Sequence, residues 1–245
     1  MTEPKPLAHA AIHDTVEKLL ADETPARLLD VPAGEGALSS RLDRLGFEVT
    51  CADLYPEIFK LDGHQITQAD LDARLPFDDA SFSYVVCVEG LEHIENPANA
   101  VREFSRLLCP GGTLIVSVPN IMNIEERFKW LINGHTSHFR PLSHEFLSAV
   151  RRDHPGTEAA ALHINPIGYS EVRYLLESNG FVLKGTYRDK PKANAWAFRP
   201  FAGLIRLISR LTPKDKREER WADELNSDEV LLGGNTLIMK AQKYE

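Results

Sequence analysis

The amino-acid sequence predicts an α/β fold in which a doubly wound, mostly parallel sheet lies between two layers of helices. Three observations lead to this fold class. Residues 27–45 read as a strand, a glycine turn and a helix, and short buried strand patterns alternate with helical patterns as far as residue 118. The 245 residues are 43% hydrophobic and 26% charged, which is the size and composition of one α/β domain with insertions.

The first strand and its turn read RLLDVPAGEGALSS over residues 27–40. A short apolar run ends in Asp30 and passes through a Pro/Ala/Gly turn into a segment with helical spacing of leucines. Gly34 and Gly36 have no Cβ, so the backbone can bend sharply there and a ligand can approach closely. The start of the helix adds unpaired N–H groups. This turn predicts a cradle for a nucleotide-type cofactor, and a loop that only reverses the chain is the alternative.

The same turn leaves an NAD-dependent oxidoreductase open. Gly34-x-Gly36-x-x-Ser39 nearly satisfies the dinucleotide fingerprint, although Ser39 stands where that motif has its third glycine. Asp53 ends the second strand at about the 20-residue spacing expected of an acid that binds a ribose diol. The competing interpretation makes Asp53 a turn or cap residue ahead of Tyr55.

The remaining elements follow from periodicity and from turn residues. The predicted strands cover 47–52, 64–68, 84–88, 113–118, 181–187 and 235–241, and the predicted helices cover 7–22, 97–108, 124–134, 145–152, 170–179 and 200–211. His9 and His13 lie four residues apart on the first helix, and we expect both on its solvated face, with no metal. Asn123 and Glu126 resemble a capping box.

Charge and cysteine content narrow the function class. The net charge of −8 and the pI of about 5.6 argue against a nucleic-acid partner recognised through an overall positive field. Cys51, Cys87 and Cys109 have neither metal-ligand nor paired spacing, which favours small core residues in a reducing compartment. The first residues contain no apolar leader core, and no stretch approaches 18 uninterrupted apolar residues. We therefore expect a cytoplasmic protein without a membrane-spanning helix.

Five segments together resemble the class I S-adenosylmethionine-dependent methyltransferases, with a Rossmann-like, type 11/23-like domain. They are LLDVPAGEG at 28–36, ADL at 52–54, QADL at 68–71, FSYVVCVEGLEHIENP at 82–97 and LLCPGGTLIVSVPN at 107–120. The resemblance implies a seven-stranded, mostly parallel sheet whose last strand is antiparallel. One departure is Pro32, where the family usually has glycine, so that a backbone N–H is missing.

The resemblance also implies a binding role for S-adenosyl-L-methionine at matched positions. The assigned residues form the floor of the site, contact the ribose and the adenine, and line the edge near the amino-acid end. They are Asp30, Gly34, Gly36, Asp53, Leu54, Asp70, Leu71, Glu89 and Gly90. Asp72 is an equal rival of Asp70 for the adenine contact.

We expect one domain over 1–245, with an N-terminal helix within 1–24 and two insertions. The first insertion, 119–166, lies on the substrate side and holds His135, His138, His144 and His163. Methyl transfer to a hydroxyl requires removal of its proton, a role that suits histidine near neutral pH. We rank His138 and His163 first as catalytic residues, with His93 after the fourth strand close behind. No fixed ligand spacing supports a metal, so none is predicted.

The second insertion, 188–232, contains WAFRPFAGLIRLISRL. Its apolar residues recur at helical spacing, with Pro200 expected in the first turn. Residues 188–220 hold ten Lys/Arg against four Asp/Glu, in a chain that is acidic overall. This pattern favours either a peripheral membrane contact through 196–211 or a helix that caps the site or forms a homodimer contact. We expect the following KDKREERWADEL to form a solvated helix or lid.

The sequence thus predicts an S-adenosylmethionine-dependent methyltransferase that methylates an oxygen of a small-molecule, glycan or lipid-linked acceptor. An NAD-dependent oxidoreductase and a non-catalytic cofactor-binding regulator remain as alternatives.

Overall fold

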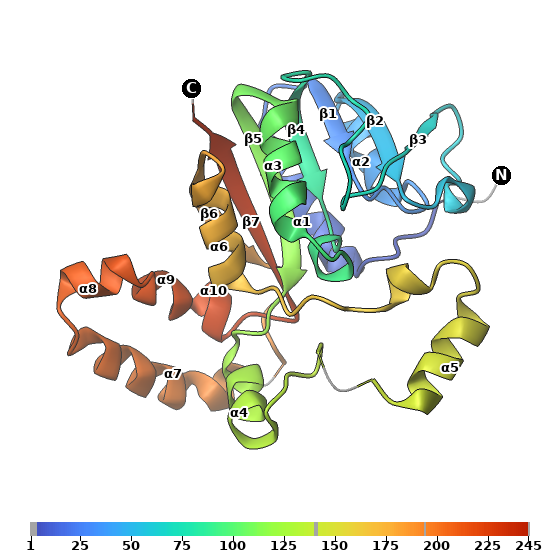
Figure 1. Ribbon diagram of the computed structural model, residues 1–245. Helices are drawn as coiled ribbons and strands as arrows, with labels where there is room; N and C mark the ends of the chain where they lie inside the picture. The colour runs from blue at the N-terminus through green and yellow to red at the C-terminus, as the bar shows by residue number, and fades with distance from the viewer. Residues whose placement is uncertain (1–3, 140–141, 194, 245) are drawn as a thin grey trace.

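The computed structural model describes residues 4–139, 142–193 and 195–244. Parts of the predicted N-terminal segment (1–3) and of the two insertions (140–141 and 194) lie outside these ranges. Within them the chain forms a seven-stranded sheet in the order β3-β2-β1-β4-β5-β7-β6 (Figure 1). The strands are β1 (Arg27–Asp30), β2 (Glu48–Asp53), β3 (Ile66–Gln68), β4 (Phe82–Cys87), β5 (Leu108–Pro119), β6 (Phe181–Arg188) and β7 (Thr236–Lys243).

Helices cover both faces of the sheet, so the predicted three-layer, doubly wound fold is confirmed. α1 (Ala10–Leu20) and α2 (Ala37–Arg44) cover one face, where Leu28 and Val86 contribute to a shared core. α3 (Pro97–Leu107) and α6 (Tyr169–Ser178) cover the other face, over Leu29 and Val85. Neighbouring residues of one strand point to opposite faces, which explains why these strands are apolar throughout.

The order of the last strands distinguishes this sheet from a plain dinucleotide-binding sheet. β7 lies between β5 and β6 and pairs antiparallel with both, while the other neighbouring strand pairs are parallel. This arrangement confirms the expected antiparallel last strand.

The two insertions lie beyond the carboxyl ends of the strands (Figure 1). The first contains α4 (Ile124–Asn133), α5 (His144–Asp153) and η3 (Glu158–Ala161), and the second contains α7 (Ala195–Arg210), α8 (Lys214–Glu219), α9 (Ala222–Leu225) and α10 (Asp228–Leu231). Two short 3₁₀ turns, η1 (Pro56–Ile58) and η2 (Leu91–His93), follow β2 and β4. No helix in the described ranges is both long and apolar enough to cross a bilayer.

Two local predictions need correction. Pro200 lies inside α7 rather than in its first turn, because the helix already begins at Ala195. Ala195 and Phe198 pack against the cluster of Ala202, Leu231 and Leu232. The predicted capping box of α4 is half formed. Asn123 accepts from the Glu126 N–H, but the Glu126 carboxylate accepts from the Ser137 N–H instead.

Candidate functional site

A cavity of about 330 Å³ lies at the carboxyl ends of β1, β2 and β4. Residues that directly follow these strands line it, and further walls come from the start of the chain and from residues 160–163. Ligand sites of parallel sheets lie at this edge, because the loops after neighbouring strands converge there. The volume falls within the range of small-molecule pockets.

The glycine turn forms one wall. Gly34 lines the cavity with φ +56°, and its N–H donates to Asp53 Oδ2 at 2.8 Å. Gly36 does not line the cavity. It is the N-cap of α2 with φ +91°, and a Cβ there would lie 2.7 Å from Leu61 Cβ and 2.8 Å from Phe59 Cε2. The first glycine therefore faces the cavity, whereas the second permits the tight entry into the helix.

Asp53 joins the ends of β1 and β2. Its Oδ2 accepts from Gly34, and its Oδ1 accepts from the Tyr55 N–H at 2.9 Å. The turn interpretation of Asp53 is therefore realised, and the carboxylate nevertheless lines the cavity. Each carboxylate oxygen has two lone pairs, so both can still accept from a ribose hydroxyl. Burial raises the pKa of Asp53, against the effect of the backbone bonds.

Asp30 forms the floor with Ser39. Asp30 Oδ2 accepts from the Ser39 hydroxyl at 2.6 Å, while Oδ1 is buried without a hydrogen-bond partner in the described chain. Burial raises the pKa of Asp30 to about 7. Ser39, which stands where the dinucleotide fingerprint has its third glycine, is thus hydrogen-bonded to the floor of the cavity.

Asp70 and Asp72 differ in their partners and in whether they line the cavity. Asp70 lines the cavity, beside Leu54 and Leu71. Asp72 accepts from the backbone N–H groups of Glu95 and Asn96 at 3.0 and 2.6 Å and does not line the cavity. Asp72 therefore fixes the loop after β4, and Asp70 is the acid that a ligand would meet.

Glu89 and Gly90 border the end of the cavity that follows β4, across β1 from the ends of β2 and β3, where Asp53 and Asp70 lie. Glu89 has φ +50°, a strained conformation for a residue with a side chain. Its N–H donates to Ser117 Oγ at 2.9 Å, and the Ser117 hydroxyl donates back to Oε1 at 3.2 Å. Burial raises the pKa of Glu89 to about 7. Gly90 is tightly packed, since a Cβ there would lie 2.9 Å from Cys87 Sγ and from Pro32 Cδ.

The three ranked histidines gather at this end. His93 and His163 line the cavity, with ring centroids 4.8 Å apart. His138 stacks on His163 at 6.2 Å but does not line the cavity. Burial, together with the neighbouring His93 and His138, lowers the pKa of His163 to about 4, so its ring is neutral near pH 7.

Sequence reasoning missed several lining residues. His13 is buried at 6% exposure and lines the cavity, so its assignment to a solvated face is wrong. The sequence contained a sign of this burial, because position 13 shares a helix face with the apolar residues Val16 and Leu20. Tyr55 and the 160–161 segment also line the cavity. The segment comes from an insertion whose path the periodicity does not reveal.

The chemistry of the cavity fits a cationic ligand better than a dinucleotide. The lining contains five carboxylates and one lysine, namely Asp30, Glu35, Asp53, Asp70, Glu89 and Lys5. Such acceptors suit a sulfonium cofactor whose ribose hydroxyls and amino groups are donors. A pyrophosphate would be repelled, and the Gly34 N–H that could face it is already bonded to Asp53.

Comparisons with known proteins agree with this geometry. Residues 29–116 match the family described as "Methyltransferase domain". A ubiquinone biosynthesis O-methyltransferase of Xanthomonas campestris pv. campestris is 40% identical over 107 residues, which cover 39% of this chain and 44% of that protein. The match thus spans about half the length of the curated relatives.

Solved structures share the fold over nearly the whole chain. A SAM-dependent methyltransferase from Archaeoglobus fulgidus has a TM-score of 0.56 at 13% identity and covers 94% of both chains. The phosphoethanolamine N-methyltransferase 2 of Haemonchus contortus, solved with S-adenosyl-L-methionine, has a TM-score of 0.56 at 15% identity, over 96% of this chain and 52% of its own. Residues 29–116 therefore match the methyltransferase domain family, and the chain as a whole has the fold of the class I S-adenosylmethionine-dependent methyltransferases.

Proposed function

We propose that this chain is an S-adenosylmethionine-dependent methyltransferase that methylates an oxygen of a small-molecule, glycan or lipid-linked acceptor. The observation that carries the proposal is the polarity of the cavity. Asp53 and Asp70 lie at the ends of β2 and β3 and offer carboxylates for a nucleoside, whereas His93 follows β4, across β1 from them, with His163 beside it. This separation suits a cofactor bound along the strand ends with its methyl group toward the histidines.

The reaction would be an in-line displacement. An oxygen lone pair of the acceptor attacks the methyl carbon, the carbon–sulfur bond breaks, and its electron pair stays on sulfur to give S-adenosylhomocysteine. The acceptor proton needs a base, and His93, His163 and His138 are the candidates. A carbonyl oxygen can only accept, so the 2.9 Å contact of His93 Nδ1 with the Leu162 carbonyl makes Nδ1 the donor. The basic nitrogen of His93 is then Nε2.

Oxygen as the target is supported by these histidines and by the names of the curated relatives, which are O-methyltransferases. The matched residues make up the cofactor half of the chain, so the acceptor itself is inferred from the insertions. The second insertion has an excess of Lys and Arg over residues 188–220, and helices of both insertions carry exposed apolar side chains.

A lipid-linked acceptor is supported by the α4–α7 apolar surface. We define this surface by exposed side chains on the two helices, which meet where the Phe128 and Phe201 rings lie 5.9 Å apart: Phe128, Leu131, Ile132, Phe201, Leu204 and Ile208. Figure 1 shows α4 beside the first turns of α7. Exposed Arg199 and Arg210 on α7 add positive charge. Such a surface suits peripheral binding to an anionic membrane.

Methyl transfer is tested with a labelled methyl donor and cell extract separated into lipid, polysaccharide and small-molecule fractions. We expect label in one of these fractions and S-adenosylhomocysteine as the product. Binding of S-adenosylhomocysteine without transfer to any fraction would favour a non-catalytic regulator. Binding of a nicotinamide dinucleotide but not of S-adenosylhomocysteine would favour the oxidoreductase.

Membrane binding is tested by flotation with phosphatidylcholine vesicles with or without phosphatidylglycerol. We expect flotation with the anionic vesicles at low salt, and its loss in a Leu204→Ser/Ile208→Ser variant. Tyr174→Ser is the matched control, because Tyr174 is exposed at 62% on α6, away from this surface. Absence of flotation combined with a dimer by light scattering that the double variant disrupts would assign the surface to a second copy.

A further inference from the structure

Glu92 is a buried carboxylate with no visible compensation. It lies in η2, directly after the loop that follows β4, and is 0% exposed. Neither Oε1 nor Oε2 has a hydrogen-bond partner in the described chain. Burying a polar group without a partner is costly, and a buried charge far more so, and such orphaned atoms in native structures often face a water or an ion. The methyl transfer described above makes no use of Glu92.

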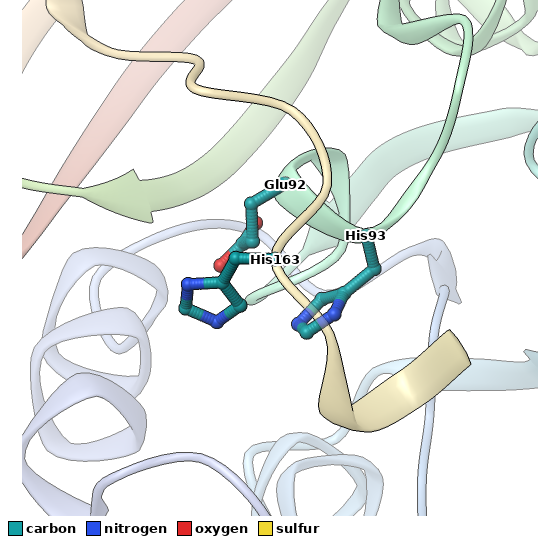
Figure 2. A group of neighbouring side chains, drawn as sticks. All are labelled: Glu92, His93 and His163. Atoms are coloured by element: carbon teal, nitrogen blue, oxygen red, sulfur yellow. The ribbon is translucent and has the colours of Figure 1, made fainter. Parts of the chain in front are cut away.

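Two imidazoles lie beside this carboxylate. Figure 2 shows Glu92 and His93 extending from the same turn, with His163 brought in from a separate segment. The backbone N–H groups of Ile164 and Asn165 both donate to the Glu92 carbonyl, at 2.9 and 3.1 Å, and fix His163 against η2. Nδ1 of His93 donates to the neighbouring Leu162 carbonyl, so Nε2 carries the lone pair. A histidine ligand is commonly oriented in this way by a hydrogen bond from its other nitrogen.

The three side chains match the ligand set of a metal ion. One donor atom from each of Glu92, His93 and His163 lies within 4.8 Å of the others. Ligands about 2.0–2.2 Å from an ion lie roughly 3–4 Å from one another, so small side-chain rotations would close the site. We propose that Glu92, His93 and His163 bind one divalent transition-metal ion of the Zn²⁺ type. Two imidazoles and one carboxylate suit such an ion, whereas Mg²⁺ and Ca²⁺ prefer oxygen ligands.

The position of the site gives the ion a role that rests on the proposed function. His93 and His163 line the acceptor end of the cavity, so an ion held there by three protein ligands keeps a coordination position open toward it. An acceptor hydroxyl in that position would have a lowered pKa and a fixed orientation. His93 and His163 would then act as ligands, and His138, stacked on His163, stands next to them.

Metal binding is measured without any methyl transfer, on the full chain stripped of metal by a chelator. We expect isothermal titration calorimetry with Zn²⁺ to reveal a single tight site, and Co²⁺ to produce a visible absorption band. Glu92→Gln and His163→Ala should each weaken Zn²⁺ binding by about tenfold or more. His144→Ala is the matched control, because His144 is exposed at the start of α5, and it should bind Zn²⁺ as the wild type does.

Three results would overturn the site: no Zn²⁺ binding by the wild type, wild-type binding by His163→Ala, or Mg²⁺ binding that matches Zn²⁺. Circular dichroism checks that Glu92→Gln folds, and His163→Ala provides an independent test if it does not. S-adenosylhomocysteine is titrated into the same metal-free protein. Cofactor binding without metal binding would refute this inference alone, and metal binding without cofactor binding would refute the proposed function alone.

Discussion

Replacement of Asp53 by asparagine separates the two roles that the structure gives to this carboxylate. In the wild type each oxygen accepts one backbone N–H, from Gly34 at 2.8 Å and from Tyr55 at 2.9 Å. Asparagine keeps the shape but places an NH₂ group against one of these donors. Hydrogen bonds to charged groups contribute about 1.5–3 kcal/mol, so we expect a similar loss of folding stability. The loss of one acceptor for the ribose should weaken S-adenosylhomocysteine binding about 10- to 100-fold, because each factor of ten is about 1.4 kcal/mol.

Asp72→Asn is the matched control for this prediction. Asp72 also accepts two backbone N–H groups, from Glu95 and Asn96, but it does not line the cavity. Asp72 is exposed and Asp53 is buried, so Asp72→Asn should lose less stability than Asp53→Asn in thermal unfolding, and only Asp53→Asn should lose affinity in calorimetric titration. If Asp53→Asn bound S-adenosylhomocysteine as tightly as the wild type, or if Asp72→Asn weakened binding as strongly, the assignment of the ribose to Asp53 would be refuted.

Two further predictions concern the glycine turn after β1 and the floor of the cavity. Gly36→Ala should lower the thermal midpoint by several degrees more than Gly63→Ala, at about 2–4 °C per kcal/mol. Both positions have positive φ, but of the two only Gly36 would bring a Cβ into collision with neighbouring atoms. Equal midpoints of the two variants would contradict this packing. The pKa of Asp30, raised to about 7 by burial, means that folding favours its protonated form, so its stabilising contribution is present at acid pH and is lost as pH rises through 7. The stability difference between wild type and Asp30→Asn should therefore change by about 2 kcal/mol between roughly pH 5.5 and 7.5 in denaturant titrations, and a constant difference would refute the raised pKa.

The cavity lining near the glycine turn was predictable because its residues directly follow strands. Asp30, Asp53 and Glu89 each end or follow a buried strand, and parallel strands place their carboxyl ends at one edge. The short glycine turn identified Gly34 by the same reasoning. Gly36 was assigned the same role, but its tight contacts with Leu61 and Phe59 depend on the path of a loop that local periodicity does not specify.

The cavity lining around the histidines was predictable only in part. His93 and His163 were named as candidates, but the approach of His163 to Glu92 depends on backbone bonds between η2 and a segment far along the chain. His138 belongs to the same insertion and lies one ring away from the cavity lining. No pattern within a single helix or strand specifies how such a connection folds back, because its geometry is set by long-range contacts.

The most direct test of the central claim is a crystal structure of the chain with S-adenosylhomocysteine. The account predicts that the ribose hydroxyls contact the Asp53 carboxylate, that the adenine lies against Leu71 near Asp70, and that the sulfur points toward the end lined by Glu89 and His93. A ligand bound outside this cavity, or bound with its adenine at the histidine end, would contradict the account.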